Sequence, residues 1–225
     1  MKLLRTSLAI ARKDFRIETR QKDLVVSTLL FSVLVTVLGG LVFYVDPQSA
    51  KDVAPGSLWL ALLFSGILIM GRSWARESEE GAIHSLLMAP SPRAAIFVGK
   101  AISAWCFLML VAFAILPLLF VFFQLPFSSF DFTLVALVIL GTWGFIASGT
   151  LFSMLTVQSN ARDLVLSVVV FPLITPALLG AAIATREHFA GASFSETLGW
   201  MRILLAFDLV SFVGGSFVFE YLAKD

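Results

Sequence analysis

The thirty residues AISAWCFLMLVAFAILPLLFVFFQLPFSSF (101–130) contain no Asp, Glu, Lys or Arg. A helix of about 17–25 apolar residues crosses about 30 Å of hydrocarbon, so this run is long enough to span a membrane and leaves room for a tilt or a short turn. The strands of a membrane β-barrel are instead short and alternate in polarity. The stretch therefore predicts a chain that crosses a bilayer as helices.

Five further runs that are free or almost free of charge lie on either side of it. They cover residues 24–45, 53–71, 132–161, 164–185 and 203–219, and only Asp208 interrupts the last. Charged residues make up 14% of the chain, against roughly a quarter in soluble domains. We predict an all-α membrane protein, a single transmembrane domain over residues 1–225. Its six transmembrane helices are expected at about 24–45, 54–71, 98–123, 133–157, 164–185 and 203–221.

The distribution of Lys and Arg predicts the orientation of these helices. Thirteen of the 16 Lys and Arg residues fall in the two terminal segments, in 72–100 and in 158–163, all on one side of the predicted bilayer. Lys and Arg are kept on the cytoplasmic side, so both termini are predicted to be cytoplasmic. Interfacial aromatic residues are then expected near the outer surface (Tyr44, Trp59, Trp200) and near the inner surface (Trp74, Trp105, Tyr221).

The first 22 residues predict an amphipathic helix at the membrane surface. At 100° per residue the apolar stripe of this helix holds Leu4, Leu8, Ala11 and Phe15. The neighbouring basic face holds Arg5, Arg12, Arg16 and Arg20. Such a helix lies in the headgroup plane with its arginines at anionic lipid. It serves either as a topology anchor or as an elbow that transmits movement of a partner.

A charged segment, RESEEGAIHSLLMAPSPR (76–93), separates the second and third predicted spans. Its acids come first, which favours a helix N-terminus, and Ile83, Leu86 and Leu87 follow with the spacing of one apolar face. Pro90 and Pro92 end the helix. The pattern predicts a short cytoplasmic helix, within 72–94, that fits a groove in another protein. A helix lying on the lipid is the alternative, although an anionic leaflet would repel its acids.

Polar and helix-breaking residues inside the spans are candidates for a path or hinge. Pro172 and Pro176 mark a bent helix, either a packing kink or a flexible point near a translocation path. Asp208 is the acid within the predicted spans, and it is either functional or close to the interface near Arg202. A further pair of small residues, Gly144 and Ser148, indicates close helix approach within the subunit or across a dimer.

The residues for catalysis or for a bound cofactor are missing from the pattern. An intramembrane enzyme needs a nucleophile with a base, or a metal cluster, at membrane depth, and the spans hold neither a His nor a second carboxylate. His84 and His188 fall on opposite sides of the membrane. Gly99-Lys100 is no phosphate-binding loop, because Ala94 stands where the first glycine belongs. We expect no directly bound cofactor, no metal site and, from the net charge of +1, no nucleic-acid partner.

The segment between the second and third spans also resembles the coupling helix of type-2 ABC exporter permeases. The residues that carry this resemblance are a glutamate-rich stretch followed by Gly81, Leu86, Leu87, Pro90 and Gly99-Lys100. More narrowly, the chain resembles the CcmB family, the haem exporter permeases of cytochrome c maturation. This similarity rests, over about 130 residues, on Ala54-Pro55-Gly56 with Trp59, Arg72, Leu87-Met88 with Pro90 and Pro92, Trp105, and Pro172 with Pro176.

The resemblance implies a non-catalytic, multi-pass permease subunit of the bacterial inner membrane. It implies a homodimer that works with a separate ATP-binding cassette subunit, where ATP binds, and with haem-handling membrane subunits; haem is a possible cargo. The residues assigned to docking of the ATPase are Arg76, Glu77, Glu79, Glu80, Gly81, Ile83, Leu86 and Leu87. Two alternatives remain open: a type-2 permease for a lipid, polysaccharide or drug, and a membrane scaffold that transports nothing.

Overall fold

The computed structural model of the chain describes residues 2–20, 22–42, 47–79, 92–156 and 171–222. The helices in this part are α1 (Lys2–Arg20), α2 (Lys22–Val42), α3 (Pro47–Glu79), α5 (Arg93–Phe122), α6 (Phe132–Thr156), α8 (Phe171–Phe189) and α9 (Phe194–Leu222), with the 3-10 turn η1 (Phe127–Ser129). No strand occurs among the described residues. The predicted all-α membrane fold is confirmed.

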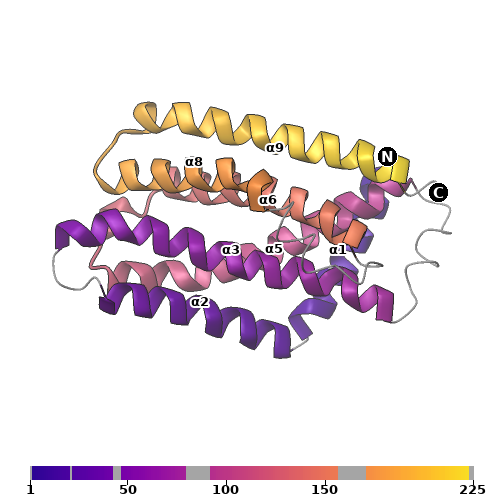
Figure 1. Cartoon of the computed structure of the whole chain (residues 1–225), viewed down its shortest axis with the longest axis horizontal. Coiled ribbons are helices and arrows are strands. Elements are labelled where there is room, and N and C mark those ends of the chain that lie inside the picture. The colour runs from indigo at the N-terminus through magenta and orange to yellow at the C-terminus, as the bar shows by residue number, and fades with distance from the viewer. Residues whose placement is uncertain (1, 21, 43–46, 80–91, 157–170, 223–225) are drawn as a thin grey trace.

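The long helices lie side by side along the long axis of the molecule, and α1 crosses them near one end (Figure 1). Both termini lie at this end, which we call the terminal end. The opposite end, which we call the loop end, holds η1 and the turn between α8 and α9. The two charged termini therefore share one side of the bundle, as the Lys and Arg distribution predicts.

Five helices of the described part are long and apolar enough to cross a membrane. They are Lys22–Val42, Lys51–Arg72, Arg93–Phe122, Phe132–Ser153 and Phe194–Tyr221. The predicted fifth span, 164–185, extends beyond the described residues, and α8 carries its remaining part.

Two helices extend past their predicted bounds. The helix α3 begins at Pro47, so Pro55 lies inside it and not in its first turn, and it continues past residue 71 to Glu79. Residues 73–79 contain only Ser, Trp, Ala, Arg and Glu, none of which stops a helix. The helix α9 begins at Phe194, where Ser193 and Glu196 cap it: the Ser193 N–H donates to Glu196 Oε2 over 2.6 Å. The C-terminal end of α3 and the N-terminal end of α9 thus depend on helix propensity and capping, whereas the predicted bounds followed hydropathy.

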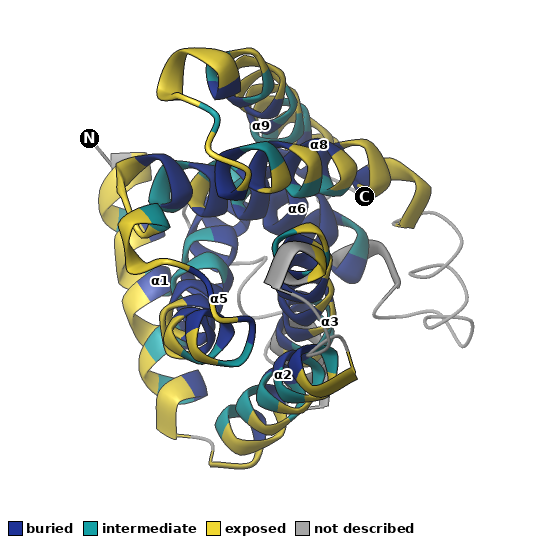
Figure 2. Ribbon diagram, turned by 90° about the vertical axis from the view of Figure 1, so that its left-hand side faces the viewer, coloured by how far each residue is buried: buried dark blue, intermediate teal, exposed yellow. Residues whose placement is uncertain are grey.

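The helix α2 shows the polarity of a membrane protein. Its buried face, turned to the bundle, carries small and hydroxyl side chains at a four-residue spacing: Thr28, Ser32, Thr36 and Gly40. Its leucines Leu30, Leu34 and Leu38 are exposed. Lipid tails are as apolar as leucine, so small residues at the interface permit close approach and leave leucine for the lipid. Figure 2 shows the exposed residues of α2 on the outer side of the bundle.

Hydrogen bonds between side chains connect pairs of spans. Trp59 Nε1 of α3 donates to Thr185 Oγ1 of α8 over 3.0 Å, and Trp105 Nε1 of α5 donates to Thr142 Oγ1 of α6 over 3.1 Å. The Trp59 indole is only 3% exposed. Trp59 therefore faces the bundle and not the headgroups, and its predicted depth near the outer surface stays a prediction.

Glycine allows α6 to approach two other helices closely. A Cβ at Gly141 would overlap the Trp59 ring of α3 and lie 2.8 Å from the Ala181 Cβ of α8. Contacts this close are available only to a residue without a side chain. The α3–α6–α8 contact thus depends on this position.

We expect Gly141→Ala to destabilise the bundle, because the new methyl group overpacks the Trp59 contact at a cost of about 1–3 kcal/mol. The matched control is Gly214→Ala in α9, where no atom lies within 4 Å of the added Cβ. Helix propensity there favours alanine by up to about 1 kcal/mol. The thermal midpoint in detergent should fall for the first variant and stay constant or rise for the second. Equal midpoints would contradict the packing of α6 described above.

Candidate functional site

The predicted docking segment joins α3 to α5, two helices that pack against each other. Arg76, Glu77 and Glu79 lie in the last turns of α3. Glu77 and Glu79 are therefore at the C-terminal end of a helix and not at the N-terminal end of a new one, which corrects the expected role of the helix dipole for these two acids. Their side chains lie outside the described part.

The other docking candidates, Glu80, Gly81, Ile83, Leu86 and Leu87, lie outside the described residues, as does His84. The short helix expected there stays a prediction. The two helices that flank it are described, and both reach the terminal end.

The start of α5 is crossed by α1. A Cβ at Gly99 would lie 2.8 Å from the Ile10 Cβ and from the backbone carbonyl oxygen of Ser7. Glycine therefore lets the two helices touch through their backbones. Figure 2 looks along the bundle and shows α1 beside α5, with the buried residues of α1 facing the bundle and its exposed residues facing outward.

A buried ion pair joins α1 to α5 at this crossing. Lys100 Nζ lies 3.3 Å from Asp14 Oδ2, and the two side chains are 1% and 8% exposed. Lys13 Nζ also contacts Asp14, from the exposed side, at 2.9 Å. One turn further along each helix, Ser103 Oγ donates to Glu18 Oε2 over 3.4 Å. A buried charge is costly without a partner, so this geometry holds α1 in one position on α5.

This ion pair was not predicted from the sequence. In the sequence Lys100 belongs to a Gly-Lys motif, and no sequence motif indicates a role for Asp14 or Glu18. A signal was present: these two acids share one face of α1 with Ser7 and Ala11, opposite the arginines. An acidic stripe opposite a basic face indicates that the acids meet a cation in the protein. The sequence does not say which one.

Apolar contacts also attach the start of α5 to the rest of the bundle. Phe97 is fully buried and its ring centroid lies 5.8 Å from that of Phe219 in α9. A cluster of buried residues around them, including Ala147 and Leu151 of α6, joins three helices at the terminal end. The first two turns of α5 therefore contact α1 on one side and α6 and α9 on the other.

Asp208 is buried between α6 and α9. It does not lie at the membrane–water interface near Arg202, which was the alternative position expected from the sequence. The Gly144 N–H donates to Asp208 Oδ1 over 2.8 Å. A Cβ at Gly144 would lie 2.5 Å from that oxygen, so only glycine leaves room for the carboxylate. One turn away, Ser148 Oγ donates to Ser211 Oγ over 3.0 Å. The Gly144/Ser148 pair thus serves helix approach within the subunit.

The three path or hinge candidates are not brought together. Pro172 and Pro176 lie on an exposed side of α8, which continues through Pro176 as a helix. Asp208 faces α6 instead. A joint role of the three in one polar path stays an untested prediction, and their described surroundings differ.

The loop end is closed by polar contacts among its connecting residues. His188 Nε2 lies 2.9 Å from the Ser129 carbonyl oxygen and 3.2 Å from Asp131 Oδ1. Arg186 Nε donates to Asp52 Oδ1 over 2.8 Å, on the surface. The His188 ring is 7% exposed, so it acts as a packed structural residue between the α5–α6 connection and α8.

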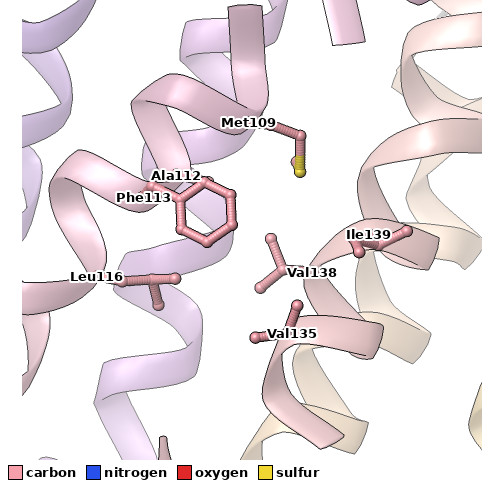
Figure 3. A pocket seen from close by; sticks show the side chains of 7 residues that line it. All are labelled: Met109, Ala112, Phe113, Leu116, Val135, Val138 and Ile139. Atoms are coloured by element: carbon pink, nitrogen blue, oxygen red, sulfur yellow. The ribbon is translucent and has the colours of Figure 1, made fainter. Parts of the chain in front are cut away.

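An apolar groove lies between α5 and α6 in the spanning part of the bundle. Figure 3 shows Met109, Ala112, Phe113 and Leu116 of α5 facing Val135, Val138 and Ile139 of α6. The groove has no polar side chain in its lining and offers packing without directional contacts. Among the described residues, no group of three His, Cys, Asp or Glu side chains is placed to hold a metal ion.

Comparison with known proteins gives one family over nearly the whole chain. A family model described as "CcmB protein" matches residues 5–222. A protein of Paracoccus denitrificans named "Heme exporter protein B" is 31% identical over 186 residues, which are 82% of this chain and 84% of that protein.

Relatives from other bacteria carry the same name. "Heme exporter protein B" of Pseudomonas aeruginosa is 27% identical and covers 90% of both chains. The protein of that name in Rhodobacter capsulatus is 29% identical over 88% of this chain and 90% of its own. The family match includes most of α1 and all of α5, and hence the crossing between them.

We expect Lys100→Met to lower the free energy of unfolding by up to about 3–5 kcal/mol, because it removes the buried partner of the Asp14 carboxylate and leaves only the half-exposed Lys13 in contact with it. The double variant Asp14→Asn/Lys100→Met removes both charges and should recover part of this loss. Lys13→Met is the matched control, since that side chain is 49% exposed, and a surface ion pair contributes at most about 1 kcal/mol. Thermal midpoints in detergent measure all three, and a double variant no better than Lys100→Met would contradict the pairing.

Proposed function

The chain belongs to the CcmB protein family, and from this premise we propose that it is the membrane permease subunit of an ATP-driven haem exporter in cytochrome c maturation. The single observation that carries this function is the family match over residues 5–222. The all-helical bundle agrees with it, because five of its described helices can cross a bilayer. The name of the relatives supports haem as the cargo. We assign no residue to haem.

ATP hydrolysis is assigned to a separate cassette subunit. The sequence lacks a phosphate-binding loop, and the proposal accordingly places ATP on another subunit that contacts this chain. The segment 72–94 is the proposed contact, with Arg76, Glu77, Glu79, Glu80, Gly81, Ile83, Leu86 and Leu87 as its docking residues. The position of the flanking helix ends at the terminal end supports this assignment.

Movement of the docking segment would pass into the bundle through both flanking helices. The helix α3 is continuous from Pro47 to Glu79, so a displacement at its end is carried along its whole length to Trp59 and its bond with Thr185 of α8. The helix α5 is attached to α1 by Lys100 and to α9 by Phe97. Because α1 is attached to the first turns of α5, it would move with them, which is the elbow role proposed for α1.

The assembly and location belong to the same proposal. We place the chain in the bacterial inner membrane, with both termini in the cytoplasm, as a homodimer with a cassette ATPase and haem-handling membrane subunits. The common end of the termini and the excess of Lys and Arg there support this orientation. Nothing in the composition indicates a nucleic-acid partner.

Charge reversal of Glu77, Glu79 and Glu80 to Lys should abolish co-purification of the ATPase while the chain still inserts, because the change affects only the proposed contact. Glu220→Lys is the matched control: it is an exposed acid at the same end, in the last turn of α9. Retention of the ATPase by the triple variant and by a variant with proline inserted at Leu86 would exclude docking through this segment.

Deletion of the gene tests the cargo. We expect loss of covalent haem from all c-type cytochromes, measured by haem staining, with lipid and polysaccharide export unchanged. Recovery should require the wild-type chain and should fail with the triple charge reversal. A strain that keeps its c-type cytochromes but loses an envelope lipid or polysaccharide would favour a permease for another cargo.

A further inference from the structure

The outward face of α1 carries a shallow basic groove. Its lining consists of Ala9, Arg12, Lys13, Arg16 and Ile17. Arg12, Lys13 and Arg16 are exposed, and Ala9 and Ile17 form the apolar floor between them. The groove is independent of the proposed ATPase contact, since it lies on a different element.

The groove lies on the side of α1 that faces away from the protein. Ser7, Ala11, Asp14 and Glu18 form the buried face toward α5. At 100° per residue Ala9, Arg12 and Arg16 fall on the opposite face. The fold thus turns the acids of α1 inward and its arginines outward.

This separation leaves the two arginines of the groove without an acidic partner among the described residues, whereas Lys13 contacts Asp14. Asp14 is held by Lys100 inside the bundle and Glu18 by Ser103. Within the described part of the chain, Arg12 and Arg16 form no ion pair, and Arg5 and Arg20, on the same face, form none either. Such a surface is complementary to an anion with several oxygen acceptors.

The position of α1 along α5 places the groove close to the boundary between the hydrocarbon and the headgroups. The two helices cross at Gly99 and Lys100, seven residues after α5 begins at Arg93. At about 1.5 Å per residue this is about 10 Å from the helix start. The 30 residues of α5 extend about 45 Å, against about 30 Å of hydrocarbon, so roughly 7 Å at each end of the helix lies outside the hydrocarbon and the crossing lies within a few Å of its boundary.

Exposed leucines beside the arginines support the same depth. Leu4 and Leu8 are 66% and 60% exposed. They lie on the side of α1 next to Arg12. A bilayer that takes these leucines among its acyl chains brings the arginines to the level of the phosphates.

We propose that this groove is a binding site for an anionic phospholipid of the leaflet at the terminal end. Arg12 and Arg16 bind the phosphate oxygens, Lys13 adds charge, and Ala9 and Ile17 contact the glycerol and upper acyl carbons. The lipid lies on the face of α1 opposite the Lys100–Asp14 pair. Binding therefore holds α1 at the membrane surface while the ion pair holds it to α5.

The test is native mass spectrometry of the full-length chain in detergent, titrated with dioleoyl-phosphatidylglycerol or dioleoyl-phosphatidylcholine. The wild type should bind phosphatidylglycerol more tightly. Arg12→Gln/Arg16→Gln should weaken this binding about 30-fold, at about fivefold for each arginine near a membrane surface. Arg12→Lys/Arg16→Lys keeps the charge and should stay close to wild type. Arg202→Gln, an exposed arginine of α9, is the matched control and should not change the affinity.

Three results would overturn the proposal. The first is equal binding of the two lipids by the wild type, or unchanged phosphatidylglycerol binding by the glutamine variant. The second is full displacement of phosphatidylglycerol by millimolar inorganic phosphate, which would make the groove a site for the free ion. The third is loss of ATPase co-purification in the glutamine variant with lipid binding intact, which would make it a protein interface. The thermal midpoint of each variant shows that α1 is still folded.

Discussion

A backbone N–H or C=O without a partner costs several kcal/mol in hydrocarbon, and this penalty governs the rest of the structure. It forces the uncharged runs into helices, since each helix satisfies its own backbone. The lipid also removes the usual hydrophobic drive between helices, so the spans are joined by close contact and by side-chain hydrogen bonds. Trp59 with Thr185, Trp105 with Thr142 and Ser32 with Ser65 meet this need in the described part of the bundle.

The cost of placing charge in hydrocarbon drives ionised side chains to the ends of the bundle, and the terminal end organises them most fully. The helix α1 presents arginines outward and acids inward. Among the residues described, Lys100 is the cation at this end whose whole side chain is buried, and it lies beside Asp14. The ion pair lies where α5 emerges from the proposed ATPase-docking segment. The helix α1, which the sequence predicts to lie at the membrane surface, is therefore also fixed to the first turns of α5.

Much of the fold was predictable because hydropathy and charge are local properties. The long uncharged runs, the shared side of the termini and the polar face of the amphipathic N-terminus needed no tertiary information. The differences have physical causes. The helix α3 continues to Glu79 because residues 73–79 tolerate helix, whatever their hydropathy. Tryptophan is common at the membrane interface, where its ring contacts headgroups, but Trp59 faces the bundle and its N–H donates to a hydroxyl in α8.

The sequence by itself determined that the chain is a helical membrane protein, which side its charges favour and which family it resembles, because these depend on run length, composition and short motifs. Only the tertiary structure decided which faces of the helices meet. Lys100 and Asp14 are 86 positions apart, and Trp59 and Thr185 are 126 apart. Hydropathy gives the length of a span but not its rotation about its own axis, and a one-residue turn of about 100° would point each of these side chains away from its partner.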